Sequence, residues 1–290
     1  MNKVALCLFI KDENIYLNEF LNHYINILKV DHIFIFDNND LNGEVVSFDN
    51  RYNDNVTVFN VRGEKLVMFQ GYSFCYQLCS YYNYDWVVYV DVDEFIVFNH
   101  YKNIHEFLYN PIYNDYTEIK INWRVYDDND HIYYENKPLN ERFTRPATIN
   151  PQINIHTKTI IRTNKETTNP YITSIKINNK EYKSCHYFNN PHFSLCKGKS
   201  CNILGQEIEP NQPWNNNYEE TYKVGYIKHF LTRSTEEYIN KIKRGKPEVE
   251  WYDTIEGHKK FYFNINIYTE EKNNYIENEL KKIIYNNISY

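Results

Sequence analysis

The stretch of sequence that decides the expected fold is Asp85-Trp86-Val87-Val88-Tyr89-Val90-Asp91-Val92-Asp93-Glu94-Phe95-Ile96-Val97-Phe98. It contains a short, continuous run of apolar and aromatic residues from 86 to 90. Such a run is typical of a strand that is buried on both faces of a parallel sheet. Three carboxylates follow, and then four more apolar residues. The carboxylates are therefore expected at the edge of a core, where an unpaired charge is costly.

These carboxylates, Asp91, Asp93 and Glu94, predict a metal site. Side chains alternate along an extended strand, so Asp91 and Asp93 are expected to point the same way. Two carboxylates that face the same space repel each other unless a positive charge lies between them. A hard divalent cation, Mg²⁺ or Mn²⁺, is the candidate, and it would bring substrate phosphates with it. The alternative is a solvated turn that ends the strand, but a turn is not normally followed at once by Phe-Ile-Val-Phe.

Composition limits the possible functions. The 290 residues are enough for one large domain or two small ones, and 17% aromatic residues are ample for a core. The net charge of −6 argues against a nucleic-acid-binding surface, so any phosphate site must be local. No stretch is long enough to span a membrane, and no secretory signal is evident. We therefore expect a cytoplasmic protein with six reduced cysteines, and peripheral attachment to a membrane stays open.

Strands and helices alternate through the first hundred residues. Buried strands are predicted at residues 4–10, 32–36 and 56–61, before the strand that begins at Trp86. Two helices are predicted between them from apolar residues at helical spacing. Their apolar faces comprise Leu17, Phe20, Leu21, Tyr24 and Leu28 in the first helix, and Met68, Tyr72, Cys75, Cys79 and Tyr82 in the second. This alternation predicts an α/β fold with a mainly parallel sheet and right-handed crossovers.

Ligands of such sheets bind beyond the carboxyl ends of the strands. Three of these ends carry polar clusters, at residues 11–14, 37–40 and 91–94. Three clusters on one rim predict a polar ligand of the size of a nucleotide.

The second half of the chain is less regular. Half-exposed strands are predicted at residues 118–123, 158–162 and 181–188. A late helix begins at the capping box of Ser234 and Glu237 and is ended by Gly245 and Pro247. The cations at its end, Lys241, Lys243, Arg244 and Lys246, either suit the helix dipole or bind a diphosphate or an anionic lipid. Residues 269–288 predict a terminal amphipathic helix for packing or self-association.

The ordered motifs resemble those of glycosyltransferases of family 2 and of the family 92-like group, which have the nucleotide-sugar (GT-A) fold. The similarity runs from residue 3 to about 247. The matching pieces are Phe9-Ile10-Lys11-Asp12-Glu13-Asn14, Val30-Asp31-His32-Ile33-Phe34-Ile35-Phe36-Asp37-Asn38, Gln70, residues 86–96, Asn140-Glu141-Arg142-Phe143, Lys158-Thr159-Ile160-Ile161-Arg162, residues 229–234 and residues 241–245. Two departures are Asp12-Glu13, where the family usually has Asn-Glu, and Arg124-Val125-Tyr126-Asp127-Asp128, where it normally carries glycine.

The resemblance implies a metal-dependent transferase that moves a sugar from a nucleotide-diphosphate donor, a UDP-sugar, to a hydroxyl of a glycan or glycoconjugate, with inversion. It implies a nucleotide-binding half at residues 1–98, a mixed acceptor half at 99–247 and a helical extension at 248–290. The implied donor-binding residues are Lys11, Asp12, Glu13, Asp37, Gln70, Asp91 and Arg244. The implied ligands of Mn²⁺ or Mg²⁺ are Asp91, Asp93 and His229. The candidate base is Glu141, with Asp127 and Asp128 as alternatives and Arg142 as its partner.

Parts of the sequence also suggest two other classes of protein. Cys185, His186, His192, Cys196 and Cys201 offer zinc ligands for a non-catalytic sugar- or nucleotide-binding protein, although their spacing matches no usual zinc pattern. A haloacid-type phosphatase would need its Asp pair after the first strand and a small hydroxyl residue soon after it. Phe95 and Ile96 occupy those places, which argues against that class.

Overall fold

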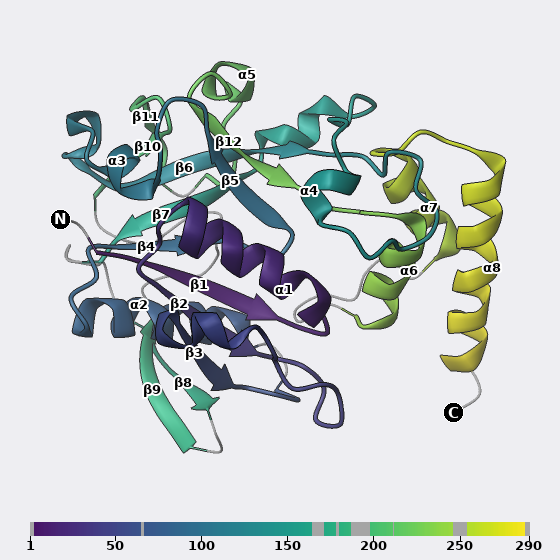
Figure 1. The fold of residues 1–290 in the computed structure, drawn as a ribbon, viewed down its shortest axis with the longest axis horizontal. Helices are drawn as coiled ribbons and strands as arrows, with labels where there is room; N and C mark the ends of the chain where they lie inside the picture. The colour runs from purple at the N-terminus through teal and green to yellow at the C-terminus, as the bar shows by residue number, and fades with distance from the viewer. Residues whose placement is uncertain are drawn as a thin grey trace. The chain divides into compact units, whose positions relative to one another are not determined.

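The computed structural model describes residues 3–64, 67–163, 171–177, 180–186, 198–210, 212–245 and 254–287 (Figure 1). The chain divides into two compact units, which are described separately. The first unit comprises Met1–Trp123 and Asn154–Ile227, and the second comprises Arg124–Ile153 and Lys228–Tyr290. The domain boundaries expected from the resemblance stay a prediction.

The first unit contains the predicted parallel strands: β1 (Val4–Ile10), β2 (His32–Asp37), β3 (Val56–Asn60) and β4 (Trp86–Tyr89). They lie in the order β3-β2-β1-β4, and every neighbouring pair is parallel. All residues of β1 and β4 are buried, as expected for apolar strands with covered faces. The carboxyl ends of these strands therefore meet at one edge of the sheet.

The sheet continues beyond β4 with mixed directions. Its further strands are β6 (Tyr116–Val125), β7 (Thr157–Arg162), β10 (Lys199–Asn202) and β11 (Glu207–Ile208). Strand β7 is antiparallel to both β4 and β6, whereas β10 is parallel to β6 and antiparallel to β11. Strands β5 (Glu94–Phe98) and β12 (Gly225–His229) pair with each other, and β8 (Tyr171–Ile177) forms a separate hairpin with β9 (Lys180–His186). The α/β fold class, with a parallel half and a mixed half, is confirmed.

Helices of the first unit pack on the parallel strands. Helix α1 (Asn14–Leu21) continues into a π-helical turn, η1 (Asn22–Ile27), and its five predicted apolar residues are all buried. Helix α2 (Met68–Tyr81) contacts β1, β4 and the β8–β9 hairpin. The shorter helices are η2 (Asn50–Asn55), α3 (Ile104–Leu108), η3 (Pro111–Tyr113) and α5 (Tyr218–Thr221), and η4 (Pro151–Ile155) crosses from the second unit into the first.

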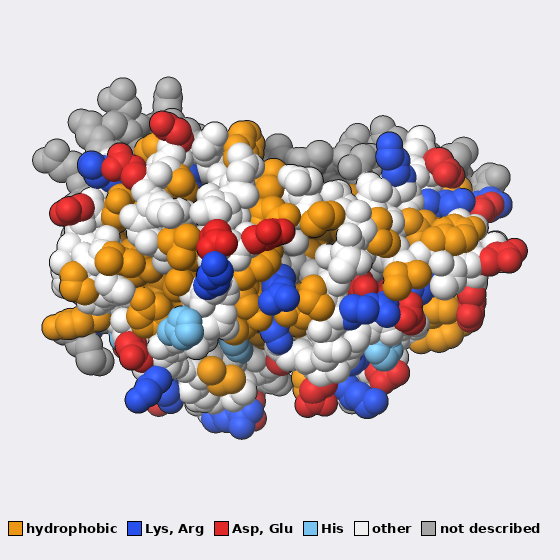
Figure 2. All heavy atoms as spheres, turned by 90° about the horizontal axis from the view of Figure 1, so that it is seen from above, with side chains coloured by type: hydrophobic (Ala, Val, Ile, Leu, Met, Phe, Trp, Pro, Cys, Tyr) orange, Lys and Arg blue, Asp and Glu red, His pale blue; other side chains and the backbone are white. Residues whose placement is uncertain are grey.

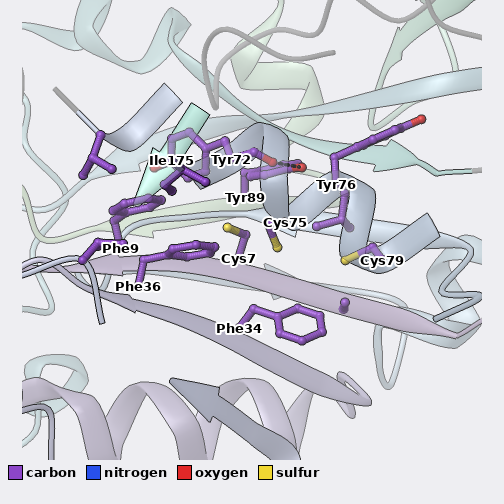
Figure 3. Packing of buried hydrophobic residues seen from close by; sticks show 14 of the residues in the cluster. Cys7, Phe9, Phe34, Phe36, Tyr72, Cys75, Tyr76, Cys79, Tyr89 and Ile175 are labelled. Carbon is purple, nitrogen blue, oxygen red and sulfur yellow. Dashed lines mark hydrogen bonds between the residues drawn. The ribbon is translucent and has the colours of Figure 1, made fainter. Parts of the chain in front are cut away.

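One core of the first unit lies between α2 and the sheet (Figure 3). Alternate residues of β1, which are Ala5, Cys7 and Phe9, belong to it, because successive side chains of a strand point to opposite faces. Cys75 and Cys79 on α2 join Cys7 in this core, and all three are free thiols. Burial raises the pKa of each thiol, so all three stay protonated and serve as small core residues.

The second unit contains α4 (Leu139–Arg142), α6 (Thr235–Lys243), α7 (Ile255–Phe263) and α8 (Glu270–Asn287). The predicted capping box of Ser234 and Glu237 is confirmed, and α6 is followed by Gly245 at φ +72°. Tyr238 and Ile239 of α6 pack with Tyr262, Ile276 and Leu280. Lys246 and Pro247 lie outside the described residues, and self-association through α8 stays a prediction. Within the described ranges, no helix is both long and apolar enough to cross a membrane.

We predict that Gly71→Ala destabilises the first unit, because α2 lies very close to β1 at this position. An added Cβ would lie 2.1 Å from Cζ of Phe9, and overpacking of this kind costs about 1–3 kcal/mol. Urea unfolding measures the loss. Phe9→Leu removes the tip of the ring, so the double variant should be more stable than the sum of the two single losses predicts. Additive losses would mean that these two residues do not clash.

Candidate functional site

The segment after β4 is a turn, and this corrects the sequence-based expectation of an extended strand. The Glu94 amide donates to the Asp91 carbonyl at 3.0 Å, and the Asp91 amide donates to Oε2 of Glu94 at 2.8 Å. The prediction that an extended strand runs through Asp91 and Asp93 is therefore wrong, and whether their side chains face the same space stays a prediction. The Asp91 side chain is 41% exposed, whereas Asp93 is 3% exposed. The sequence placed the carboxylates correctly at the end of a buried strand, but it did not reveal that the chain turns there into β5.

A lysine supplies the positive charge that this carboxylate cluster needs. Lys158 Nζ lies 2.6 Å from Oδ2 of Asp91 and 3.4 Å from Oε2 of Glu94. Burial alone would lower the pKa of Lys158, but Asp91 and Glu94 outweigh this effect and raise it, so the ammonium stays charged. Burial also raises the pKa of Glu94, to about 8, against the opposing effect of Lys158. The sequence showed Lys158 only as part of a family motif, because nothing local connects it with Asp91.

The polar clusters after β1 and β2 interlock, as their place on one rim predicted. The Asn38 amide donates to the Ile10 carbonyl at 2.9 Å, and the Asp12 amide donates to Oδ1 of Asn39 at 2.6 Å. Lys11 Nζ lies 3.5 Å from Oδ1 of Asp40. Asp12 has a φ of 51°, in the left-handed region that non-glycine residues rarely adopt. Hydrogen bonds thus hold the loops after β1 and β2 together at the carboxyl ends of these adjacent strands.

Asp37 is a buried residue whose carboxylate holds the loop after β2 in place. It is 2% exposed, and its two carboxylate oxygens accept from the backbone amides of Asn39 at 3.1 Å and Val46 at 3.4 Å. Arg62, at the end of β3, lies with Nε 3.9 Å from Asp37 and donates to the Asp40 carbonyl at 2.8 Å. Arg62 was not predicted as part of the rim, although its position just after β3 would have indicated it. Contact between Asp37 and a nucleotide stays a prediction.

Glu13 and Gln70 lie at the beginnings of the two helices that follow β1 and β3. Glu13 is 8% exposed at the N-cap of α1. Gln70 is the third residue of α2, and its Oε1 is buried with no hydrogen-bond partner among the residues that the structure describes. A buried acceptor without a donor is costly. Gln70 Oε1 is thus suited to accept a hydrogen bond from a ligand hydroxyl or N–H.

Asp128 in the second unit is a structural hub. Its carboxylate is fully buried and accepts from the Tyr262 hydroxyl at 2.6 Å and from Lys272 Nζ at 2.7 Å. Its backbone amide donates to Oδ1 of Asn266 at 2.8 Å. Lys272 is only 1% exposed and donates a further bond to the Ile267 carbonyl at 3.2 Å. These contacts fasten the loop after β6 to α7 and α8.

Asp127 is held in place as firmly. Its Oδ2 accepts from Arg145 Nε at 2.6 Å, and its Oδ1 accepts from the Asn129 amide at 2.8 Å. Arg145 also donates to Oδ2 of Asp130 at 2.9 Å, and this bond lowers the pKa of Asp130. Asn129 and Asp130 both adopt positive φ, at 47° and 65°. The Arg145 guanidinium thus binds both Asp127 and Asp130, and these contacts stabilise the strained turn at residues 127–130.

Glu141 differs from these carboxylates, because its side chain is exposed on α4. Its neighbour Arg142 forms a bidentate ion pair with Glu237, with N···O distances of 2.6 and 2.9 Å. The guanidinium expected to orient Glu141 is thus engaged by Glu237, a carboxylate that the sequence did not connect with it. This pair ties α4 to the capping box of α6.

Two further candidates lie in the second unit. His229 is the last residue of β12, is 3% exposed, and accepts at its carbonyl from the Tyr126 amide at 3.0 Å. Arg244 is the C-cap of α6. Their roles toward a metal ion and a diphosphate stay predictions. Of the zinc candidates, only Cys201 has a described side chain, and burial raises its pKa. The side chains of Cys185, His186, His192 and Cys196 are outside the described part.

Carboxylate oxygens are the groups of this rim that could hold a metal ion. In the described ranges, no group of three or more His, Cys, Asp and Glu side chains is arranged to hold a metal ion. Mg²⁺ and Mn²⁺ do not need such a group when one or two carboxylates and substrate phosphates complete the coordination. Cations and carboxylates are interspersed on the face drawn in Figure 2, so the side chains described on this face form no extended basic surface for phosphates.

Comparisons with known proteins show only distant likeness. No family model matches the chain, and no curated protein matches it. Similar solved structures include a cytidylyltransferase from Leptospira borgpetersenii (13% identity, TM-score 0.28, 56% of this chain and 61% of that one). A protein described as a glucose-1-phosphate thymidylyltransferase from Bacillus anthracis has 11% identity and a TM-score of 0.29 over 47% and 62%. One described as a nucleotide-diphospho-sugar transferase from Desulfovibrio desulfuricans has 13% identity and a TM-score of 0.25 over 44% and 61%. The chain spans less than two thirds of each, and these values assign no family.

We predict that Asp128→Ala destabilises the protein by about 3–5 kcal/mol, because it leaves Lys272 buried without its main carboxylate. Urea unfolding at neutral pH measures the change. Glu141→Ala is the matched control: its carboxylate is exposed, so its effect should stay within about 0.5 kcal/mol. Equal stability of Asp128→Ala and the unmodified protein would show that the hub does not stabilise the fold.

Proposed function

We propose that the protein is a metal-dependent glycosyltransferase that moves a sugar from a nucleotide-diphosphate donor to an acceptor hydroxyl. The observation that carries this proposal is the rim at the carboxyl ends of β1, β2 and β4, where three polar clusters lie on adjacent parallel strands. Ligands of parallel sheets bind at this edge. The order of the motifs along the chain, which resembles that of family 2 and family 92-like enzymes, supports the same function.

The carboxylates of the turn suit a cation that is shared with the diphosphate. Asp91 presents a partly exposed carboxylate and Asp93 a buried one, and both are hard oxygen donors. Mn²⁺ or Mg²⁺ would be held there, with His229 as a further proposed ligand. When bound, the cation neutralises charge on the departing diphosphate.

The loops after β1 and β2, which are hydrogen-bonded to each other, are the proposed binding site of the nucleoside. Lys11, Asp12 and Glu13 are proposed to contact the base and ribose, together with Asp37. The Asp37 carboxylate already accepts two backbone amides, so it acts through the shape of the loop and through its remaining acceptor capacity. Gln70 is proposed to accept a hydrogen bond from the donor sugar or ribose, and Arg244 is proposed to pair with the diphosphate. A UDP-sugar is the proposed donor, from the resemblance.

Glu141 is the preferred base for the acceptor. The acceptor oxygen attacks the anomeric carbon, the bond from that carbon to the diphosphate breaks, and the carboxylate takes the hydroxyl proton, with inversion at the carbon. A base must be able to reach the acceptor, and the Glu141 side chain is exposed. Asp127 and Asp128 are less suited, because Arg145 and Lys272 already engage their carboxylates.

We expect Asp93→Asn to abolish sugar transfer, because the variant loses a proposed carboxylate ligand of the metal ion. Transfer is assayed with a panel of nucleotide sugars in Mn²⁺ and in excess EDTA, and the same panel is screened by thermal shift. A ligand at 100 times its dissociation constant adds about 2.7 kcal/mol of stability. Asp115→Asn, an exposed carboxylate before β6, is the control and should keep full activity.

Full activity of Asp93→Asn, or of the unmodified protein in EDTA, would overturn the metal-dependent mechanism. Nucleotide-sugar binding without turnover would instead identify a non-catalytic binding protein.

Glu141→Gln should keep donor binding and lower kcat by about 10²–10⁴-fold, because the amide cannot take the acceptor proton. Donor affinity is measured by calorimetry and kcat by initial rates at saturating acceptor. A wild-type rate in this variant would transfer the role of base to Asp127 or Asp128. Since Glu141 is exposed, a change in folding is not expected to obscure the result.

A further inference from the structure

We propose that Lys158 is a direct ligand of the donor's diphosphate, which replaces Asp91 as its partner when the nucleotide binds. This inference rests on the proposed function and adds to it a residue that recognises the second phosphate. It predicts that the site distinguishes a nucleoside diphosphate from a nucleoside monophosphate through this one ammonium.

Strand pairing puts the lysine at the rim. Strand β7 runs antiparallel to β4, with Val88 opposite Ile160. Two residues before Ile160, the chain carries Lys158, whose ammonium therefore lies beside the turn that follows β4. The Lys158 ammonium is carried by a strand, which is a more rigid support than a loop.

The two side chains of the Lys158–Asp91 ion pair differ in their exposure to solvent. The Lys158 side chain is 2% exposed, whereas that of Asp91 is 41% exposed. Glu94, the second carboxylate near the ammonium, is fully buried. Asp91 is thus the member of the pair that solvent reaches, and the ammonium is buried beside it. If a phosphate oxygen took the place of the Asp91 carboxylate, the buried ammonium would keep an anionic partner.

The exchange of partners costs little. A buried ammonium needs an anionic partner, but the net gain from any one buried ion pair is small, because desolvation offsets the Coulomb attraction. A phosphate oxygen can replace a carboxylate oxygen as the partner and preserves the charge balance. The ammonium also has three N–H donors, and its hydrogen bond to Asp91 uses one.

A second buried lysine in the same unit shows the contrasting, purely structural arrangement. Lys120 Nζ on β6 donates to the backbone carbonyls of Glu209 at 3.0 Å, Pro210 at 2.8 Å and Gln212 at 2.5 Å. Its three donors are thus satisfied by one loop, and its side chain is fully buried. Lys120 is therefore the matched control for the loss of a buried lysine.

The test compares UDP with UMP by calorimetry in Mn²⁺, for the unmodified protein, Lys158→Met and Lys120→Met. Lys158→Met should weaken UDP binding about tenfold or more and change UMP binding less than about twofold, so that the preference for UDP falls. Lys120→Met should lower the melting temperature and leave that preference unchanged. An unchanged UDP-to-UMP ratio in Lys158→Met, or an equal loss of both nucleotides, overturns the inference. Absence of nucleotide binding by the unmodified protein overturns the proposed function instead.

A second pair of variants keeps the inference testable if Lys158→Met does not fold. The double variant Lys158→Met/Asp91→Asn leaves no unpaired charge from the Asp91–Lys158 pair, and Asp91→Asn alone is its reference. Both are titrated with UDP and UMP in Mn²⁺, and because both lack the Asp91 carboxylate, the effect of losing this metal ligand cancels in the comparison. The single variant should prefer UDP and the double variant should lose that preference. The same preference in both would overturn the role of Lys158.

Discussion

The ion pair between Lys158 and Asp91 is the interaction on which the rim of the sheet depends. Three carboxylates lie among the four residues from Asp91 to Glu94, between β4 and the start of β5, and Asp93 and Glu94 among them are buried. Without the ammonium 2.6 Å from Asp91, this segment would hold like charges in a low-dielectric environment, which is costly. With it, the chain can turn sharply at the end of β4 and continue into β5.

The rim is held together by hydrogen bonds and ion pairs between the loops that follow neighbouring strands. The loop after β2 is held by Asp37 and Arg62, and it receives the amide of Asp12 from the loop after β1. Each of these groups satisfies backbone donors or acceptors that would otherwise be unpaired at strand ends. A ligand at this edge therefore meets a preformed surface, and preorganisation reduces the entropy lost on binding.

The acidic residues of the second unit are of two kinds: some form ion pairs that support the structure, and one is exposed to solvent. Asp128 joins Tyr262 and Lys272, so residues near the end of the chain fix a loop that follows β6. Asp127 is tied to Arg145, and the capping residue Glu237 is tied to Arg142. Glu141, next to Arg142 in the chain, is exposed. The difference between these acids lies in their tertiary partners, which their local sequences do not reveal.

The sequence by itself determined the parallel strands of the first hundred residues, the helices between them, the late capped helix and the place of the polar clusters. The run at Trp86, the spacing of Leu17, Phe20 and Leu21, and the capping box at Ser234 all act within a few residues, so periodicity and propensity reveal them. Tertiary structure alone decided which charges pair: Lys158 with Asp91 across 67 residues, Arg142 with Glu237 across 95, and Lys272 with Asp128 across 144. It also decided that residues 90–93 turn instead of extending, because β5 leaves the run of β4 to pair with β12. Long-range pairing depends on the register of distant strands and helices, and no local pattern encodes that register.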